Sequence, residues 1–451
     1  MRTLSLVRTH ARVRGRRTIG LFVVIALALA ACAGDEGEEA GAVDDDPDAA
    51  TEDDADEPDE PDDTDEADDT DEAATGDCDP DDPVLAGAMF SLTGPAADIG
   101  ARGEEGVEMA AETVNDGGGI LGRCLEVHLA DDEGDPTRAS QVTRELVDQV
   151  GVDFMVGPFL SSPTGTSAEV TNQAGLIHIF GSTLQEAGDP EQFPYAFRVQ
   201  VPAGLQAVTF SEFMQTAGYE SAAIVAVNND LGIGVSEAFE TVADEDGLEV
   251  TAVEFHESGD SDHTAQMQSL QGTDPDVLIV MNTAVPDIVA SVRARNSLEW
   301  DVPTVGFASM AFPEVTEAIG FDDMEDVLAG QAFINLSRDA DGNVLGGERI
   351  EDWLDRYREF VGSDELEVGP QQVASFYDGV RMFADAANAV GSLDADEIRA
   401  HLESEAYEGI MATYNYDEER HDGITLDDLA FVIARSFEDG TYEVAPQEDV
   451  E

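Results

Sequence analysis

The sequence predicts an α/β protein whose two lobes are each built on a doubly wound parallel sheet. Three observations support this prediction. From Val84 onward, short apolar runs alternate with segments in which apolar residues recur every three to four positions. This alternation runs through two successive sets, and the 374 residues from Cys78 onward are enough for two domains. Strands that alternate with helices form parallel sheets through right-handed crossovers.

In the first set, a helix over Ala101–Asn115 carries its apolar residues on one face, and the glycines at 117–119 end it. The next helix begins at Asp135 and Pro136, which suit the N-cap and the first helical position. A third helix should begin near Pro163. The strands of this set are expected at Val84–Phe90, Cys124–Ala130, Val152–Gly157 and Leu176–Phe180.

The second set predicts strands at Ala222–Val227, Leu248–Phe255, Val277–Met281 and Thr304–Phe307. Its helices are expected at Leu205–Ala217, Val235–Ala243, Thr264–Leu270 and Ile288–Arg295. From Gly330 the pattern predicts a further strand and then helices around Arg349–Phe360 and Gln371–Val390. A last strand is expected over Leu429–Phe437.

The N-terminus has the layout of an export signal. A stretch with six Arg precedes an apolar run, Ile19–Ala31, that is short for a membrane span. The run ends in Leu29-Ala30-Ala31-Cys32, which resembles a bacterial lipobox, so lipidation of Cys32 is expected. An ordinary signal with a chance cysteine is the alternative. Both Sec and twin-arginine export remain open, because Arg16-Arg17 also precedes the apolar run.

Residues 33–77 contain 24 Asp or Glu and no basic residue, and apart from Val43 their apolar content is almost entirely Ala. Such a segment repels itself and has no core to bury, so an extended tether is expected. An acidic interaction tail is the alternative. A lipidated Cys32 and this tether would hold the folded part at the outer face of the cytoplasmic membrane.

The charge of the chain excludes two classes of partner. From Cys78 onward there are 15 Arg, no Lys and 75 acidic residues, which gives a net charge of -60. Nucleic-acid binding requires clustered positive charge, and docking on anionic lipid requires it as well. Neither is expected of the folded part of this chain.

Cys78 and Cys124 are the only cysteines after Cys32. They lie at the starts of the first two predicted strands, which are neighbours in a doubly wound sheet. Because exported domains commonly pair their cysteines, a disulfide between them is expected. Two free buried thiols are the alternative.

The residues that would indicate an enzyme or a cofactor site are missing. Gly117–Gly122 follows a helix and precedes a strand, whereas a phosphate loop needs the opposite order. The chain has no Lys for a Walker motif and no Gly-x-Ser-x-Gly elbow. His256 and His263 flank Asp260 and Asp262, which we interpret as a solvated loop rather than a metal site. We therefore expect no enzyme, no cofactor and no metal.

Several motifs, taken together, resemble the type I periplasmic binding proteins of branched-chain amino acid ABC transporters, the Leu/Ile/Val-binding family. The resemblance covers about residues 84–440. In chain order these motifs are SLTGP at 91–95, NDGGGILG at 115–122, DDEGDP at 131–136, VGP at 156–158, SGDSD at 258–262 and PDV at 275–277.

The resemblance implies a lobe I formed by residues 78–200 and 331–425, and a lobe II formed by residues 201–330 and 426–451. The chain would cross between the lobes near Val199–Pro202, Gly330 and Asp417–Ile424. A small-molecule ligand would bind in the cleft at the carboxyl ends of the strands. A monomer is expected, with the permease subunits of an ABC importer as its partners.

In lobe I, the family's carboxylate-binding serine corresponds to Ser161, near the start of the helix expected around Pro163. A hydroxyl and free N–H groups at a helix N-terminus attract anions. The alternative is that Ser161 only caps the helix. Ser182 and Thr183, after strand Leu176–Phe180, correspond to the family's second group of polar contacts.

In lobe II and the first loop, the matching positions depart from the family pattern. Its aromatic residues are replaced by Ile99, Leu231 and Ala284, and its ammonium-binding acid by Ala308. These positions predict a cleft wall that is apolar and uncharged. The expected ligand therefore has a polar head and a mainly apolar body, such as a carboxylate or an amide. Asp230 or Asp287 is the alternative source of a negative charge for an amino-acid ligand.

These features favour an extracytoplasmic solute-binding protein that delivers its ligand to an ABC importer. The alternative is a ligand-sensing receptor component. Because the chain shows no transmembrane helix or signalling domain after the lobes, a sensor would act through a separate membrane partner.

Overall fold

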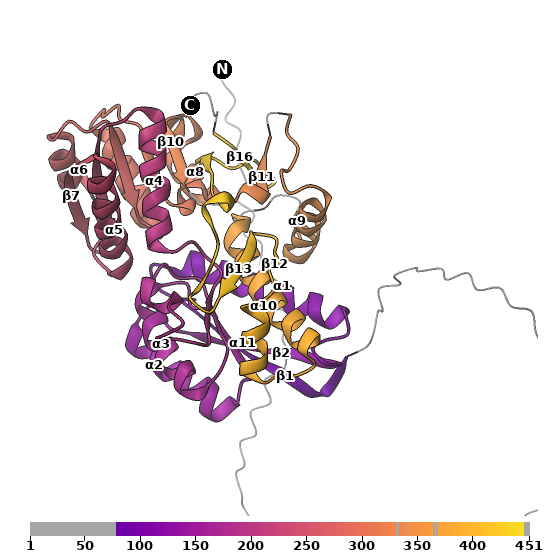
Figure 1. The fold of residues 1–451 in the computed structure, drawn as a ribbon. Coiled ribbons are helices and arrows are strands. Elements are labelled where there is room, and N and C mark those ends of the chain that lie inside the picture. Colours follow the sequence, from indigo (N-terminus) through magenta and orange to yellow (C-terminus); the bar gives the residue numbers. More distant parts are fainter. Residues whose placement is uncertain (1–77, 331–332, 340, 364–365, 367–368, 446–451) are drawn as a thin grey trace, which may run out of the picture. The chain divides into compact units, whose positions relative to one another are not determined.

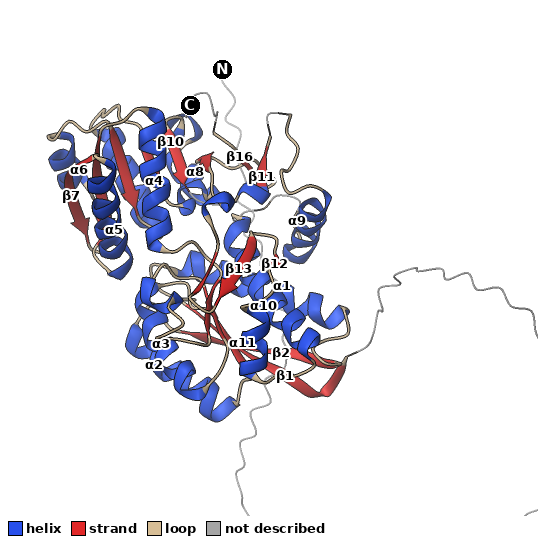
Figure 2. Cartoon of the chain, in the orientation of Figure 1, coloured by secondary structure: helices blue, strands red, loops and turns tan. Residues whose placement is uncertain are grey.

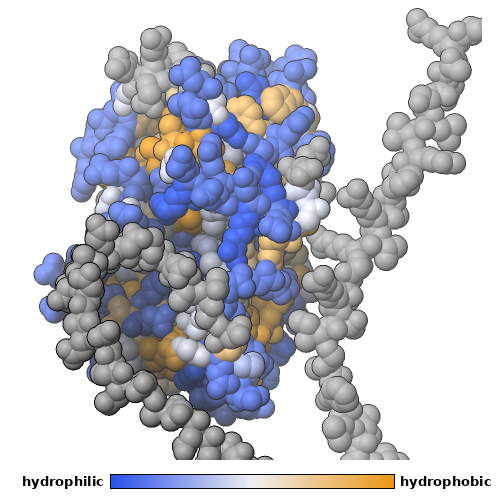
Figure 3. Space-filling view, turned by 90° about the vertical axis from the view of Figure 1, so that its right-hand side faces the viewer, coloured by the Kyte–Doolittle hydropathy of each residue, from blue (hydrophilic) through white to orange (hydrophobic). Residues whose placement is uncertain are grey.

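The computed structural model describes residues 78–330, 333–339, 341–363, 366 and 369–445 (Figure 1). The predicted signal, the lipidation site Cys32 and the acidic tether lie outside the described residues. Within the described residues, no helix has both the length and the apolar character needed to span a membrane. The molecular face shown in Figure 3 carries mostly hydrophilic side chains with smaller hydrophobic areas between them.

The first sheet is parallel throughout and has the strand order β2-β1-β3-β4-β5. Helices cover both of its faces. Met89 and Phe90, neighbours on β1, point to opposite faces of the sheet, and each belongs to a different hydrophobic cluster. The strands are β1 (Asp79–Phe90), β2 (Arg123–Asp131), β3 (Phe154–Val156), β4 (His178–Phe180) and β5 (Ala196–Arg198). The covering helices are α1 (Ala97–Asp116), α2 (Pro136–Glu145), α3 (Ser161–Ala174) and α10 (Pro370–Val390), and α11 (Ala395–Leu402) packs against α10.

Helices α1 and α10 pack against each other on one face of this sheet, and α2 and α3 lie together elsewhere in the same lobe (Figure 2). On the α10 side, the rings of Phe154 and Phe383 stack with their centroids 3.7 Å apart. On the opposite face, Met89 packs with Val142 and Leu146. The sheet is therefore buried on both sides, as a doubly wound sheet must be.

The second sheet has the order β15-β10-β9-β8-β6-β7, and only β15 is antiparallel to its neighbour. Its strands are β6 (Ser221–Val227), β7 (Glu249–His256), β8 (Val277–Met281), β9 (Thr304–Gly306), β10 (Val327–Gly330) and β15 (Phe431–Ile433). Its helices are α4 (Ala203–Ala217), α5 (Asp230–Asp246), α6 (Thr264–Gln271), α7 (Val285–Ser297) and α8 (Pro313–Ile319).

The chain passes three times between the sheets: from β5 to α4, after β10, and from β14 to β15. This confirms the predicted fold class of two doubly wound lobes joined by three crossings. The remaining elements are α9 (Glu348–Val361) and two small sheets. These sheets are formed by β11 (Ser337–Arg338) with β16 (Tyr442–Glu443), and by β12 (Tyr407–Glu408), β13 (Thr413–Asp417) and β14 (Arg420–Gly423).

Several elements differ from the sequence-based expectation. The strand expected to begin at Gly330 ends there, and the last strand is limited to Phe431–Ile433. The two pair with each other, and a Cβ on Gly330 would come within 2.7 Å of the Phe431 ring. Strand β5 and helices α8 and α11 were not predicted.

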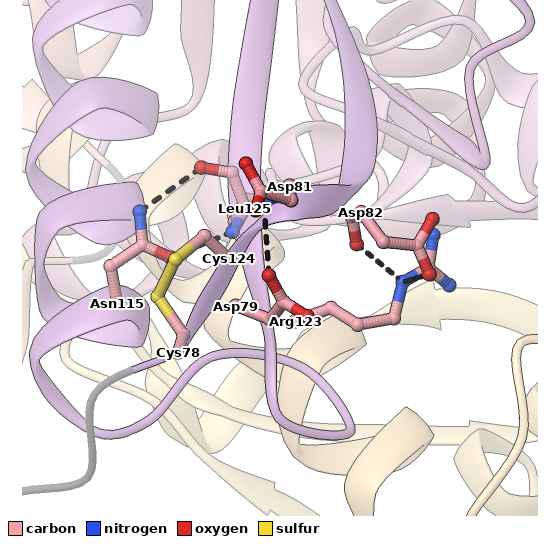
Figure 4. Close-up of a disulfide and its surroundings, with 8 residues drawn as sticks. All are labelled: Cys78, Asp79, Asp81, Asp82, Asn115, Arg123, Cys124 and Leu125. Carbon is pink, nitrogen blue, oxygen red and sulfur yellow. Dashed lines mark hydrogen bonds and ion pairs between the residues drawn. A yellow bond between two sulfur atoms is a disulfide. The ribbon is translucent and has the colours of Figure 1, made fainter. Parts of the chain in front are cut away.

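A disulfide between Cys78 and Cys124 joins the start of β1 to that of β2, which confirms the predicted pair (Figure 4). Beside it, the side-chain amide of Asn115 donates to Leu125 O at 3.0 Å and accepts from Leu125 N at 2.7 Å. Gly119 has φ +79, and a Cβ there would lie 2.8 Å from Cys78 Cβ. The glycine therefore allows the loop after α1 to pass close to the disulfide.

Candidate functional site

A cavity of about 30 Å³ lies at the carboxyl ends of strands from both sheets. Residues after β3 and β4 form one side, and residues after β8 and β9 form the other. The segment that joins β5 to α4 closes it. The lining consists of Phe159, Gly181, Thr183, Gln200, Val201, Gln206, Thr283, Phe307, Ala308, Ser309 and Gln372, none of which carries a charge. This is the position at which open α/β sheets usually bind ligands.

Of the polar residues predicted on the first lobe, Thr183 lines the cavity. Ser161 is the first residue of α3, and its Oγ lies 3.3 Å from Thr183 Oγ1. The N-cap of α3 is Leu160, so Ser161 does not occupy the capping position of the alternative interpretation. Ser182 is buried and its Oγ has no hydrogen-bond partner, while its backbone carbonyl accepts from Arg198. Their roles in ligand binding remain predictions.

Of the positions predicted to form the apolar wall, Ala308 lines the cavity. Ile99, Leu231 and Ala284 are 1%, 8% and 9% exposed, and they are not among the cavity-lining residues. Ile99 and Leu231 belong to the hydrophobic cores, and Ala284 is the N-cap residue of α7. The structure therefore brings Thr183 and Ala308 together at one cavity and places these three elsewhere.

Neither of the acids considered as an alternative counter-charge lines the cavity. Asp230 Oδ2 accepts a 2.6 Å hydrogen bond from Ser162 Oγ, which links α5 to α3. Asp287 is 1% exposed and accepts from the backbone N–H of Gly259 at 2.7 Å. Burial raises the pKa of Asp287, against the opposing effect of that hydrogen bond. An ammonium group in the cavity would therefore find no facing carboxylate.

Three glutamines at the cavity were not predicted. Gln206 Nε2 donates to Val201 O at 3.0 Å, and Gln200 Nε2 donates to Ser375 Oγ at 2.5 Å. These contacts fix the amide orientation and leave the two side-chain oxygens as acceptors. The Oε1 atoms of Gln206 and Gln372 are buried without a partner. Because glutamine is usually exposed, no local pattern distinguishes these three from surface residues.

The structure corrects the interpretation of His256 and His263 as part of a solvated loop. The two side chains are 3% and 0% exposed, and their rings stack with centroids 3.9 Å apart. Asp260 and Asp262, between them, are exposed as expected. One ligand-capable atom from each of His256, His263 and Asp287 lies within 4.8 Å of the others, so these residues are able to hold a metal ion.

Comparison with known proteins shows the family to which this chain belongs. A sequence model described as periplasmic binding protein matches residues 83–436. The leucine-, isoleucine-, valine-, threonine- and alanine-binding protein of Pseudomonas aeruginosa is 23% identical over 329 residues, covering 72% of this chain and 84% of that protein. A Leu/Ile/Val-binding protein homologue of Brucella abortus is 23% identical, covering 74% and 86%.

Solved structures share the fold. The leucine-binding protein LivK of Thermotoga maritima superposes with a TM-score of 0.68 at 20% identity, covering 81% of this chain and 99% of that one. LivJ of Streptococcus pneumoniae, solved with isoleucine, gives a TM-score of 0.68 at 21% identity, with coverage of 81% and 99%. The chain therefore belongs to the periplasmic binding protein family, whose members bind solutes outside the cytoplasm and are not enzymes.

Proposed function

We propose that this protein captures a small molecule between its two lobes and delivers it to an ABC importer. The observation that carries the proposal is the uncharged cavity at the carboxyl ends of strands from both sheets. Predicted lobe boundaries at 200/201, 330/331 and 425/426 put residues of both lobes around it. At about 30 Å³ the cavity holds little more than a water molecule, so ligand entry requires the lobes to separate.

The ligand class follows from the lining. Thr183, supported by Ser161, supplies a hydroxyl for a carboxylate or amide oxygen, and Gln206 Oε1 accepts from an N–H. Ala308 and Phe307 present apolar surface, whose burial contributes about 25 cal/mol per Å². Any ion buried without a counter-charge loses several kcal/mol, but a carboxylate would be stabilised by the Thr183 hydroxyl and by the N-terminus of α3, where Ser161 lies, whereas an ammonium group would not.

The proposed ligand is therefore a small carboxylate, amide or amino-acid-like molecule with a polar head and an uncharged, mainly apolar body. The Pseudomonas relative and the LivK and LivJ structures are named for amino-acid ligands. Their names support a ligand of similar size, while the uncharged lining of this cavity favours a different head group.

The remaining parts of the proposal rest on the N-terminal sequence. Export would be followed by lipidation of Cys32, and residues 33–77 would tether a monomeric binding protein to the outer face of the cytoplasmic membrane. ABC permease subunits would be its protein partners. A long acidic tether, which self-repulsion keeps extended, would let the lobes reach a permease while anchored.

A thermal-shift screen of the exported chain tests the proposal. The panel contains aliphatic and aromatic carboxylates, their amides and the amino acids. A ligand at one hundred times its dissociation constant stabilises the native state by about 2.7 kcal/mol. We expect at least one class of small molecule to raise the melting temperature. A flat response across the panel, repeated by calorimetry at millimolar ligand, would contradict the proposed binding of this ligand class.

A further inference from the structure

Two histidines and an aspartate are buried together in lobe II, outside the cavity lining. His256 ends β7, His263 is the N-cap residue of α6, and Asp287 lies in the first turn of α7. The three side chains are at most 3% exposed. One nitrogen or oxygen from each lies within 4.8 Å of the others. Three separate elements thus direct potential metal ligands to one point.

The hydrogen bonds around His263 leave one ring nitrogen without a partner. Its Nδ1 lies 2.8 Å from Ser291 Oγ, on α7. Its Nε2 is buried and has no hydrogen-bond partner. A buried polar atom in this state is rare in folded proteins and requires an explanation. When Nδ1 carries the proton and donates to Ser291 Oγ, Nε2 has a free lone pair, and imidazole nitrogens are the commonest metal ligands that proteins offer.

His256 has oxygen atoms next to both of its ring nitrogens. Nδ1 lies 2.9 Å from Glu257 O, and Nε2 lies 2.9 Å from Asn282 Oδ1. The amide nitrogen of Asn282 is directed at Ser291 Oγ, 3.1 Å away. With Asn282 in this orientation, a neutral imidazole can donate to only one of its two oxygen neighbours. The ring nitrogen of His256 that carries no proton keeps a lone pair, which a bound cation would accept.

The chemistry of the three candidate ligands, His256, His263 and Asp287, indicates which kind of ion they would bind. Two imidazoles and a carboxylate suit Zn²⁺ and related transition metals, whereas Ca²⁺ and Mg²⁺ prefer oxygen ligands alone. We propose that His256, His263 and Asp287 form a binding site for a divalent transition-metal ion such as Zn²⁺. Tetrahedral zinc ligands lie roughly 3.3 Å apart, so the three groups would draw together slightly when the ion binds.

An exposed loop provides the route of entry. Residues 257–262 are all exposed and separate the two histidines along the chain. Three of them are acidic, Glu257, Asp260 and Asp262, and their field raises the local concentration of cations. The N–H of Gly259 in this loop donates to Asp287. An ion on the three ligands would therefore hold the loop against α7.

The site is separate from the cavity, and the proposal does not depend on the proposed function. The nearest link is Asn282, which contacts His256 through its side chain and accepts from the cavity residue Ser309 through its carbonyl at 3.2 Å. The outcome of the ligand screen is therefore independent of whether the protein binds a metal ion at this site.

Equilibrium dialysis of the exported chain against Zn²⁺ tests the site. Physiological salt and excess Mg²⁺ are included, because they suppress binding to the many carboxylates. The wild type and Asp260→Asn, an exposed control in the same loop, should each bind one tight Zn²⁺. His263→Gln and Asp287→Asn should bind it at least tenfold more weakly. Equal affinity in all four proteins would overturn the proposal.

Cobalt gives a reading that does not depend on the variants folding. Co²⁺ added to the wild type should develop the visible absorption of tetrahedral nitrogen and oxygen coordination, saturating at one ion per chain. Excess Zn²⁺ should abolish it. If neither ion shows a saturable tight site on the wild type, the three residues form an ion-free buried polar network and the proposal is wrong.

Discussion

Arg102 on α1 and Glu314 on α8 form an ion pair between the two lobes, with Arg102 Nη2 2.5 Å from Glu314 Oε1. The Arg102 side chain is fully buried and its guanidinium lies 4.0 Å from the Phe312 ring centroid. The Ser162–Asp230 hydrogen bond is another polar contact between the two lobes, and in the proposed function both contacts would have to break when the lobes separate.

Glu314→Gln tests how strongly this pair stabilises the fold. The change keeps the shape of the side chain and leaves the buried charge of Arg102 without its partner. Because hydrogen bonds to charged groups are worth about 1.5–3 kcal/mol, we expect a loss of that order in the free energy of unfolding, measured with urea. Arg356→Gln, which removes an exposed pair with Asp116, is the control and should cost less than about 1 kcal/mol. If Glu314→Gln and Arg356→Gln lowered the free energy of unfolding equally, the buried ion pair would stabilise the fold no more than the exposed one.

The disulfide should account for all thiol chemistry of the folded part. In a Cys32→Ala background, the unfolded and unreduced chain should give no reaction with thiol reagents, since Cys78 and Cys124 are bonded. Replacing both with Ser should lower the free energy of unfolding by roughly 2–4 kcal/mol, because the bond closes a loop of 46 residues. Two titratable thiols before reduction would contradict the structure.

The buried carboxyl of Asp378 should make the free energy of unfolding depend on pH. Its carboxylate is buried and accepts from Ile410 N at 2.7 Å and Met411 N at 2.8 Å. Burial raises its pKa from 3.8 to about 7, although these hydrogen bonds oppose the shift. The folded state thus holds a proton that the unfolded chain has lost, so the stability from this group falls as pH rises from about 4 to about 7.

Urea unfolding of the wild type and Asp378→Asn across this pH range checks the sign. Asn cannot titrate, so the difference in unfolding free energy, wild type minus variant, should shrink as the pH rises. The variant also loses acceptor capacity for the two N–H groups, which shifts the whole curve without changing its slope. A difference that grows with pH would mean that the hydrogen bonds outweigh burial and hold the carboxyl ionised.

Much of the fold was predictable, because a hydrophobic repeat that continues over a long segment identifies the helix or strand clearly. Helix α10 was expected over Gln371–Val390 and is found over Pro370–Val390, and the N-cap of α2 accepts from Arg138 N through Asp135 as its sequence predicts. Strand β5 was missed, although β3, β4 and β9 are equally short and were predicted, and part of its packing comes from β14, which is distant in sequence.

The site was predictable only in part. Thr183 and Ala308, which the family resemblance predicted as ligand-binding positions, both line the cavity, and their roles in binding remain predictions. The resemblance also pointed to Ile99 and Leu231, which belong to the hydrophobic cores and are not among the cavity-lining residues. Gln200 lies in the crossing between β5 and α4, and Gln206 lies in α4, where local sequence carries no sign of what the tertiary fold brings together.

The proposed membrane anchoring depends on one residue, Cys32. Cys32→Ala should move the protein from the membrane fraction to the medium or periplasm, because no lipid can then be attached. Cell fractionation and immunoblotting check this outcome. Retention of the variant in the membrane fraction would show that another feature of the chain holds it there.

Ala308→Asp would introduce an acid at the position that, by the resemblance, corresponds to the ammonium-binding acid of the family's amino-acid binders. Because Ala308 lines the cavity, the new carboxylate should raise the affinity for leucine relative to 4-methylpentanoate. Ala308→Asn, similar in size and uncharged, should not change that ratio. An unchanged ratio in a folded Ala308→Asp variant would place the ligand's head group away from Ala308.

Calorimetry on matched ligands tests the central claim most directly. Leucine, 4-methylpentanoate and 4-methylpentanamide share one apolar body and differ in head group. An uncharged cavity with free glutamine oxygens predicts that the wild type binds the amide or the carboxylate at least as tightly as leucine. Leucine binding at least tenfold more tightly than both would reveal an ammonium site and contradict the account of the cavity.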